Sequence, residues 1–122
     1  MEGELFEQWV QAAWDALPED FRSQLRNVEV VVEDWPDRET VHLAHISYRG
    51  GLLGFYHGVP LTERGQGYYL VTPDKISIYR EPILMQCRTD AEVRELVGHV
   101  LRHEIAHHFG ISDDRLHELG AY

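Results

Sequence analysis

The chain has 122 residues and a formal net charge of −10 at pH 7, and 43% of its residues are hydrophobic. This length suits one core, so we predict a single domain over residues 1–122. The apolar fraction excludes a disordered chain, no run approaches the ~18 apolar residues of a membrane span, and the negative charge disfavours nucleic acid and anionic membranes as partners.

Two helices are predicted at the N-terminal end. Apolar residues recur at helical spacing over residues 5–17, which predicts an amphipathic helix. Its aromatic stripe is interpreted as core and not as a cofactor site. Pro18 and the two acidic residues after it are typical of a helix start, so a short second helix is expected to about Leu25.

Strand signals come next in the chain. The β-rich run Val28–Glu33 predicts a strand, which ends before Pro36 because proline lacks a backbone donor. The stretch Val41–Ile46 fits either a short strand or a helical turn, and both interpretations stay open. After a Gly-Gly turn, Leu52–Tyr56 predicts a second strand.

The middle of the chain adds further extended segments. Tyr68–Val71 follows a glycine-rich turn, and Lys75–Tyr79 has the alternating pattern of a strand. Pro82–Met85 can begin a short helix. Helices followed by strands and then by a long helix predict an α+β domain with a small mixed sheet.

A long helix is predicted from about Asp90 to about Phe109. Thr89 and Glu92 have the spacing of a capping box, in which the hydroxyl accepts from a first-turn amide while the carboxylate reaches back. Apolar residues then recur at helical spacing toward a core. These residues are Val93, Leu96, Val97, Val100, Leu101 and Ala106.

The end of this helix reads H-E-x-x-H-x-x-G-x-x-D. His103 and His107 are four residues apart, so they share a helix face and can bind a single Zn²⁺ ion. Glu104 points beside the metal, where it can take a proton from water as general base. Gly110 can end the helix and turn Asp113 back as a third ligand.

Other residues compete for these roles. His99 lies in the same row as the two histidines, but a straight helix cannot easily place three successive turns around one tetrahedral ion, so we exclude it as a ligand. It is interpreted as a supporting group or a surface residue, and His108 as facing solvent or substrate. The rivals of Asp113 as third ligand are Asp114, His117 and Glu118.

The N-terminus and the cysteine content indicate a compartment. Residues 1–4 are acidic and lack the basic and apolar regions of a secretory signal. Cys87 is the single cysteine, so no internal disulfide can form, which agrees with a reducing compartment. We therefore expect a cytoplasmic protein, while its oligomeric state stays unknown.

The chain resembles the zincin-like metallopeptidase family of short bacterial proteins, also called minimal zincins. The resemblance is carried by Leu52–Arg64, by Pro73–Arg80 and by residues 103–120, and it covers nearly the whole chain. It implies a compact zincin-like fold, in which a small mixed sheet packs on an active-site helix. It also implies one zinc ion at His103, His107 and Asp113, with Glu104 as general base.

These observations favour a zinc metallopeptidase that cleaves a peptide or an unfolded protein segment. Tyr79, His57 and His108 are candidates for the donor that stabilises the oxyanion. The alternative is a zinc-binding module or interaction protein without peptidase activity, which the short chain after Asp113 favours. A metal-dependent ribonuclease is a weaker third interpretation, because such enzymes tend to use a third histidine.

Overall fold

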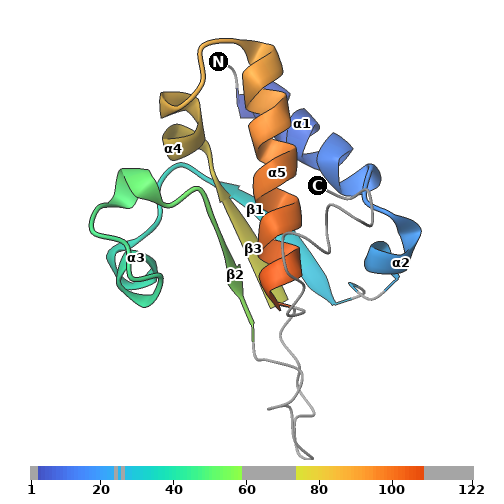
Figure 1. Ribbon diagram of the computed structural model, residues 1–122, viewed down its shortest axis with the longest axis horizontal. Helices are drawn as coiled ribbons and strands as arrows, with labels where there is room; N and C mark the ends of the chain where they lie inside the picture. Colours follow the sequence, from blue (N-terminus) through green and yellow to red (C-terminus); the bar gives the residue numbers. More distant parts are fainter. Residues whose placement is uncertain (1–2, 24, 26, 59–73, 109–122) are drawn as a thin grey trace, which may run out of the picture.

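The computed structural model describes residues 3–23, 25, 27–58 and 74–108. Helices and strands alternate irregularly along these residues, and the long helix comes last (Figure 1). The elements are α1 (Gly3–Asp15), α2 (Glu19–Arg22), β1 (Val28–Glu33), α3 (Arg38–Leu43), the 3-10 turn η1 (Arg49–Gly51), β2 (Gly54–His57), β3 (Asp74–Tyr79), α4 (Arg80–Met85) and α5 (Asp90–His108).

The three strands form one mixed sheet in the order β1-β3-β2. β1 runs parallel to β3, with Val28 opposite Asp74, and β2 runs antiparallel to β3, with Gly54 opposite Ile78. The predicted α+β class with a small mixed sheet is therefore confirmed. β3 is the central strand, so β1 and β2 form the two edges of the sheet within the described residues.

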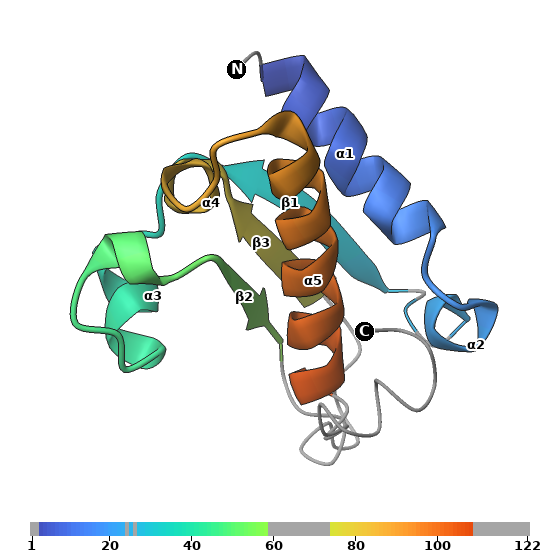
Figure 2. The same ribbon diagram turned by 45° about the horizontal axis from the view of Figure 1, so that its top comes forward.

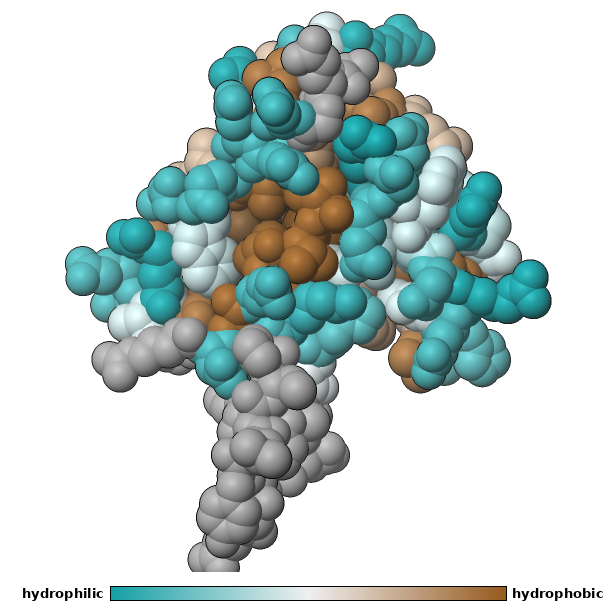
Figure 3. All heavy atoms as spheres, turned by 180° about the vertical axis from the view of Figure 1, so that it is seen from behind, coloured by the Kyte–Doolittle hydropathy of each residue, from teal (hydrophilic) through white to brown (hydrophobic). Residues whose placement is uncertain are grey.

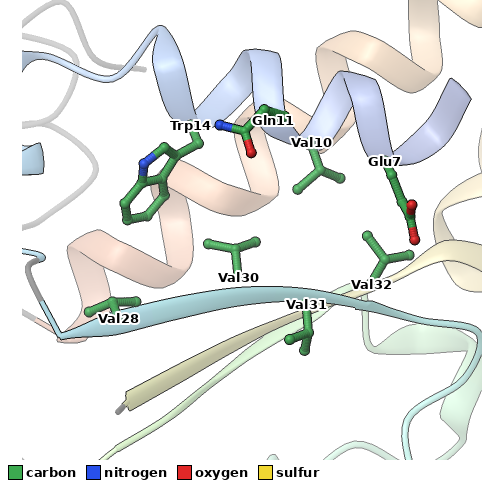
Figure 4. A pocket seen from close by; sticks show the side chains of 8 residues that line it. All are labelled: Glu7, Val10, Gln11, Trp14, Val28, Val30, Val31 and Val32. Carbon is green, nitrogen blue, oxygen red and sulfur yellow. The ribbon is translucent and has the colours of Figure 1, made fainter. Parts of the chain in front are cut away.

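Side chains of β1 alternate between the two faces of the sheet. Figure 4 shows Val28, Val30 and Val32 pointing toward α1, while Val31 points to the opposite face. This period of two is what an extended backbone imposes. The register then places Ile76 of β3 on the same face as Val30, so that one face of the sheet is apolar.

α5 and α1 pack side by side on this apolar face, as both ribbon views show (Figures 1 and 2). The helical spacing of their apolar residues directs one side of each helix into a common core. The core comprises Phe6, Val10, Leu17, Leu25, Ile76, Ile78, Ile83, Val93, Val97, Val100, Leu101 and Ile105. The predicted N-terminal helix, with its aromatic stripe turned inward, is thus confirmed.

The N-terminus of α5 has the predicted capping residues, with one difference. The backbone N–H of Glu92 donates to Oγ1 of Thr89 at 3.2 Å, as a capping box requires. The Glu92 carboxylate, however, accepts from the backbone N–H of Arg88 at 3.2 Å and not from that of Thr89. The carboxylate therefore satisfies the amide one residue before the cap.

Two predicted stretches differ from the observed elements. In the stretch Val41–Ile46, left open between strand and helix, the first three residues form the end of α3 and the last three follow it. The N-cap of α3, Asp37, accepts from the backbone N–H of Thr40 at 2.7 Å. The second strand begins at Gly54 and not at Leu52. The 3-10 turn η1 extends to Gly51, and Leu52 is the residue that caps it. The predicted segment Tyr68–Val71 lies outside the described residues.

The surface combines apolar and charged regions. Seen from behind, the middle of the molecule is apolar and hydrophilic residues surround it (Figure 3).

In the part of the chain that the structure describes, no helix has both the length and the apolar character of a membrane span.

Candidate metal centre

A groove of about 450 Å³ runs along α5 beside β2. One wall is the helix face that carries the histidine motif, and the other is the chain from the end of α3 through η1 to the start of β2. The lining residues are Ala44, Ile46, Gly51, Leu52, Leu53, Gly54, Phe55, His99, Val100, His103, Glu104 and His107. The groove is thus apolar along one wall, while histidines and a carboxylate lie along the other.

The two predicted histidine ligands lie next to each other in this groove. The ring centroids of His103 and His107 are 4.0 Å apart, with 60° between the ring planes. Zinc binds imidazole nitrogen at about 2.0–2.1 Å, so two rings this close can reach a single ion. His99 continues the row, and its ring stacks on that of His103 at 5.6 Å. It therefore lies beside a predicted ligand, as expected for a supporting group.

Glu104 lies in the same groove, and burial changes its acidity. Desolvation raises the pKa of its carboxyl from 4.5 to about 7, although a hydrogen bond from the backbone N–H of Tyr56 acts in the opposite direction. The bond also ties the carboxylate of α5 to strand β2. A carboxyl group with a pKa near neutrality can both accept and release a proton at physiological pH.

Gly54 allows α5 to lie this close to β2. A side-chain carbon at position 54 would come within 2.6 Å of Cγ1 of Val100 and 3.1 Å of the carbonyl oxygen of Ser77. Such a contact is far shorter than van der Waals distance, so any larger residue would push the helix away. The missing side chain brings Glu104, whose Cγ lies 3.5 Å from the same point, against the strand.

The third predicted ligand, Asp113, lies outside the described residues, as do its rivals Asp114, His117 and Glu118. Among residues 3–23, 25, 27–58 and 74–108, no three histidine, cysteine, aspartate or glutamate side chains are grouped as a metal site requires. The described part thus brings together two predicted ligands and the predicted base. The identity of the third ligand stays a prediction.

None of the three candidate oxyanion donors lines the groove. His57 and Tyr79 lie on the opposite face of the sheet, where His57 Nε2 is 3.1 Å from Oγ of Ser77 and Tyr79 is buried. His108 stacks on the ring of Tyr56. Successive residues of a strand point to opposite faces, and His57 lies three positions after Gly54, which faces α5. The alternation of β2 could therefore have excluded His57 as an oxyanion donor in this groove.

The sequence did not identify the apolar wall of the groove. Ala44 and Ile46 follow α3 and come next to α5 through tertiary packing alone. Tyr56 was assigned to a strand, but its contacts with Glu104 and His108 depend on how α5 crosses the sheet. The alternating pattern of β2, which places Tyr56 on the same face as Gly54, was the available signal.

A second hollow, of about 560 Å³, lies between α1 and β1 (Figure 4). It is lined by Glu7, Val10, Gln11, Trp14, Val28, Val30, Val31 and Val32. Glu7 is the one titratable side chain in this lining, and histidine is missing from it. The hollow therefore lacks the donors for a zinc site, and the groove beside α5 is the better candidate.

Two comparisons with known proteins found matches. A family model described as zincin-like metallopeptidase matches residues 25–121. Among solved structures, the chain is similar to a conserved hypothetical protein from Thermus thermophilus, with 25% sequence identity and a TM-score of 0.58. That match covers 89% of this chain and 94% of the other. No curated protein matches the chain.

Proposed function

The chain belongs to the zincin-like metallopeptidase family, and from this premise we propose that it is a zinc-dependent peptidase acting on peptides or unfolded protein segments. One observation carries the proposal. His103, His107 and Glu104 line a single groove that runs beside the edge strand β2. Two imidazoles supply two of the three protein ligands of a catalytic zinc site, and a carboxyl group with a raised pKa can serve as its general base.

The donor set fits zinc. His103 and His107 supply two imidazoles with ring centroids 4.0 Å apart, and Asp113 is proposed as the carboxylate ligand that completes the set. When bound, zinc lowers the pKa of a coordinated water toward ~7 and polarises the carbonyl of the scissile bond. His99, stacked on His103, limits the rotation of that ring.

Glu104 is proposed as the general base and acid. Its carboxylate takes a proton from the attacking water and passes that proton to the amine that leaves. The backbone N–H of Tyr56 donates to this carboxylate and so orients it across the groove. The partial burial of Glu104 lowers the local dielectric constant, which strengthens the electrostatic interactions of its charged form.

The substrate is proposed to bind as an added strand. Among the described strands, β2 is an edge that pairs with β3 on one side. An extended peptide can pair with the other side through main-chain hydrogen bonds. Ile46, Leu52 and Phe55 line the groove and offer apolar contacts to its side chains. The net charge of −10 favours neutral or basic segments over acidic ones.

Metal content is the first test of this proposal. The purified protein is expected to contain near one zinc per chain by elemental mass spectrometry. His107→Ala should abolish binding, since it removes a ligand, and Asp113→Ala should weaken it. A chain that takes up no zinc even after zinc is added would exclude the metallopeptidase mechanism.

Hydrolysis is the second test. The zinc-loaded protein is incubated with a reduced and carboxymethylated protein, and fragments are followed by mass spectrometry. Glu104→Gln should keep its zinc but lose turnover by at least 100-fold, as expected for loss of a general base. Equal turnover by both proteins would remove Glu104 from the mechanism. Zinc binding without any turnover would favour a zinc-binding module.

A further inference from the structure

The last turn of α5 that the structure describes carries a predicted ligand, His107. Helix ends are the places where helices fray, because their final carbonyl groups lack partners within the helix. The position of a ligand side chain in such a turn depends on how firmly the backbone of the turn is held. A displacement of about 1 Å is enough to impair a metal or catalytic site. Contacts that hold this turn would therefore matter for the site.

Three side chains from three elements meet at this turn. The rings of Tyr56 in β2 and His108 in α5 stack with centroids 3.9 Å apart and 8° between their planes. The Tyr56 hydroxyl donates to Oδ2 of Asp74 in β3 at 3.1 Å. Nε2 of His108 lies 3.9 Å from the same carboxylate oxygen. The last described turn of α5 thus contacts both β2 and β3.

This cluster is buried and closely packed. The side chains of His108 and Asp74 are 8% and 7% exposed. A side-chain carbon at position 58 would come within 2.8 Å of Cγ of Asp74 and of Cε1 of Tyr56, so the cluster depends on Gly58. A buried carboxylate needs hydrogen-bond donors, which makes its position specific. The three side chains are therefore held in one arrangement.

Tyr56 also contacts the turn before. Its backbone N–H donates to the carboxylate of Glu104, while its ring stacks on His108. Residues 104 and 108 lie one helical turn apart on the same face of α5. One strand residue thus contacts two successive turns of the helix.

We propose that Tyr56, Asp74 and His108 form a clamp that fixes the last described turn of α5 before any metal binds, so that His107 and Glu104 face the groove. The three are positioning residues and not ligands. The effect on zinc rests on the function proposed above. The effect on the helix itself does not, which allows the two to be tested separately.

The first experiment measures local stability in the metal-free protein by amide hydrogen exchange. His108→Ala, which removes the stacked ring, should speed exchange at residues 105–108 by at least tenfold. Exchange at residues 93–101, in the core, should stay unchanged. Tyr48→Phe is the control, because Tyr48 is 62% exposed and lies outside the clamp. Unchanged exchange at residues 105–108 would overturn the clamp.

The second experiment measures zinc affinity by competition with a chromophoric chelator. Residues that orient metal ligands typically change affinity by about 10–100-fold when replaced. His108→Ala should fall in this range, and Tyr56→Phe, which keeps the ring but loses the hydroxyl, should weaken binding by a few-fold. His108→Phe keeps a stacked ring and should recover part of the affinity. The visible spectrum of bound cobalt(II) should change in His108→Ala.

The outcomes separate the two proposals. If the wild-type protein binds zinc and the clamp variants bind it equally well, with the same cobalt(II) spectrum, the clamp has no role in the site. If the wild-type protein binds no zinc, the proposed peptidase function fails, and the exchange data alone decide whether the clamp holds the helix. A loss of affinity in Tyr48→Phe equal to that in His108→Ala would also contradict the clamp.

Discussion

Glu104 shows at the residue scale how burial changes chemistry. The carboxyl group lies within the groove, where loss of hydration disfavours its charged form and raises its pKa to about 7. A carboxyl in water, with a pKa of 4.5, would be too weak a base and too rarely protonated for both proton transfers. The position of this residue on α5, and not its identity alone, thus suits it to general acid–base chemistry.

The same shift predicts a pH effect on the stability of the metal-free protein. Because the pKa is higher in the folded than in the unfolded chain, the folded state binds more protons between these values, and the stability falls as pH rises from 4.5 to about 7. Glu104→Gln is neutral throughout. It should gain about 3 kcal/mol relative to wild type between pH 4 and pH 8.

Urea unfolding of both metal-free proteins at the two pH values measures this difference. Added zinc should reduce it, since a nearby cation favours the carboxylate. A difference that is the same at pH 4 and pH 8 would mean that Glu104 titrates normally. In that case Glu104 would be ionised near neutral pH and would have no proton to donate there.

Gly54 gives a second prediction at this scale. Gly54→Ala would place a carbon 2.6 Å from Cγ1 of Val100, and overpacking of this kind costs about 1–3 kcal/mol. Gly98→Ala in α5 is the matched control. The new carbon would meet the flexible end of Arg102 there, and alanine favours a helix over glycine by up to about 1 kcal/mol. Thermal unfolding should therefore shift in opposite directions for the two variants.

At the scale of elements, a polar network joins all three strands on the face away from α5. Oγ of Ser77 in β3 donates to Glu33 of β1 and lies 3.1 Å from Nε2 of His57 in β2. Ser77 has one proton to donate, so Nε2 of His57 donates to it. Burial lowers the pKa of His57, so the neutral ring is favoured. Burial also raises the pKa of Tyr79, on the same face, to about 12.

This network predicts the effect of removing its central hydroxyl. Ser77→Ala leaves Glu33 and His57 without their shared partner, so we expect a loss of about 1–2 kcal/mol in the free energy of unfolding. Ser23→Ala is the control, because the Ser23 hydroxyl binds the carbonyl of Asp20 at the surface, and it should change stability by less than ~0.5 kcal/mol. Equal effects in urea unfolding would show that the network adds nothing.

The sequence predicted those elements whose signals are local. The apolar periodicity and the Thr89 cap predicted α5 from Asp90, where it begins, through the last residue that the structure describes, and β1 was predicted with its observed bounds. Val41–Ile46 was left open, because so short a stretch fits either a strand or a helical turn, and its first three residues lie in α3. The contacts of His57 with Ser77 and of Tyr56 with His108 join distant segments, and no local pattern encodes such pairs.

At the scale of the whole molecule, the groove results from the way in which α5 packs against the sheet and the chain after α3. The N-terminal part of α5 packs beside α1 on one face of the sheet, as the ribbon views show (Figures 1 and 2). The histidine motif lies at the other end, where β2 and the chain after α3 form the opposite wall. The core extends along α5 as far as Ile105, while His103, Glu104 and His107 line the groove on another side of the same helix. Metal binding should therefore stabilise the fold without being required for it.

Thermal unfolding with and without zinc tests this last point. A ligand that binds only the folded state stabilises it by about 2.7 kcal/mol at a free concentration 100 times the Kd. For a chain of this size the melting temperature should rise by about 10 °C. The rise should grow with zinc concentration and disappear in His107→Ala. It should persist in His42→Ala, whose imidazole is exposed on α3 away from the groove.

The metal-free protein should still unfold cooperatively, because the core of α1, α5 and the sheet contains none of the proposed ligands. Loss of the cooperative transition on chelation would mean that zinc folds the domain, as in small zinc-dependent modules. The zinc-binding module would then be the better description. An unchanged melting temperature at every zinc concentration would argue against a zinc site altogether.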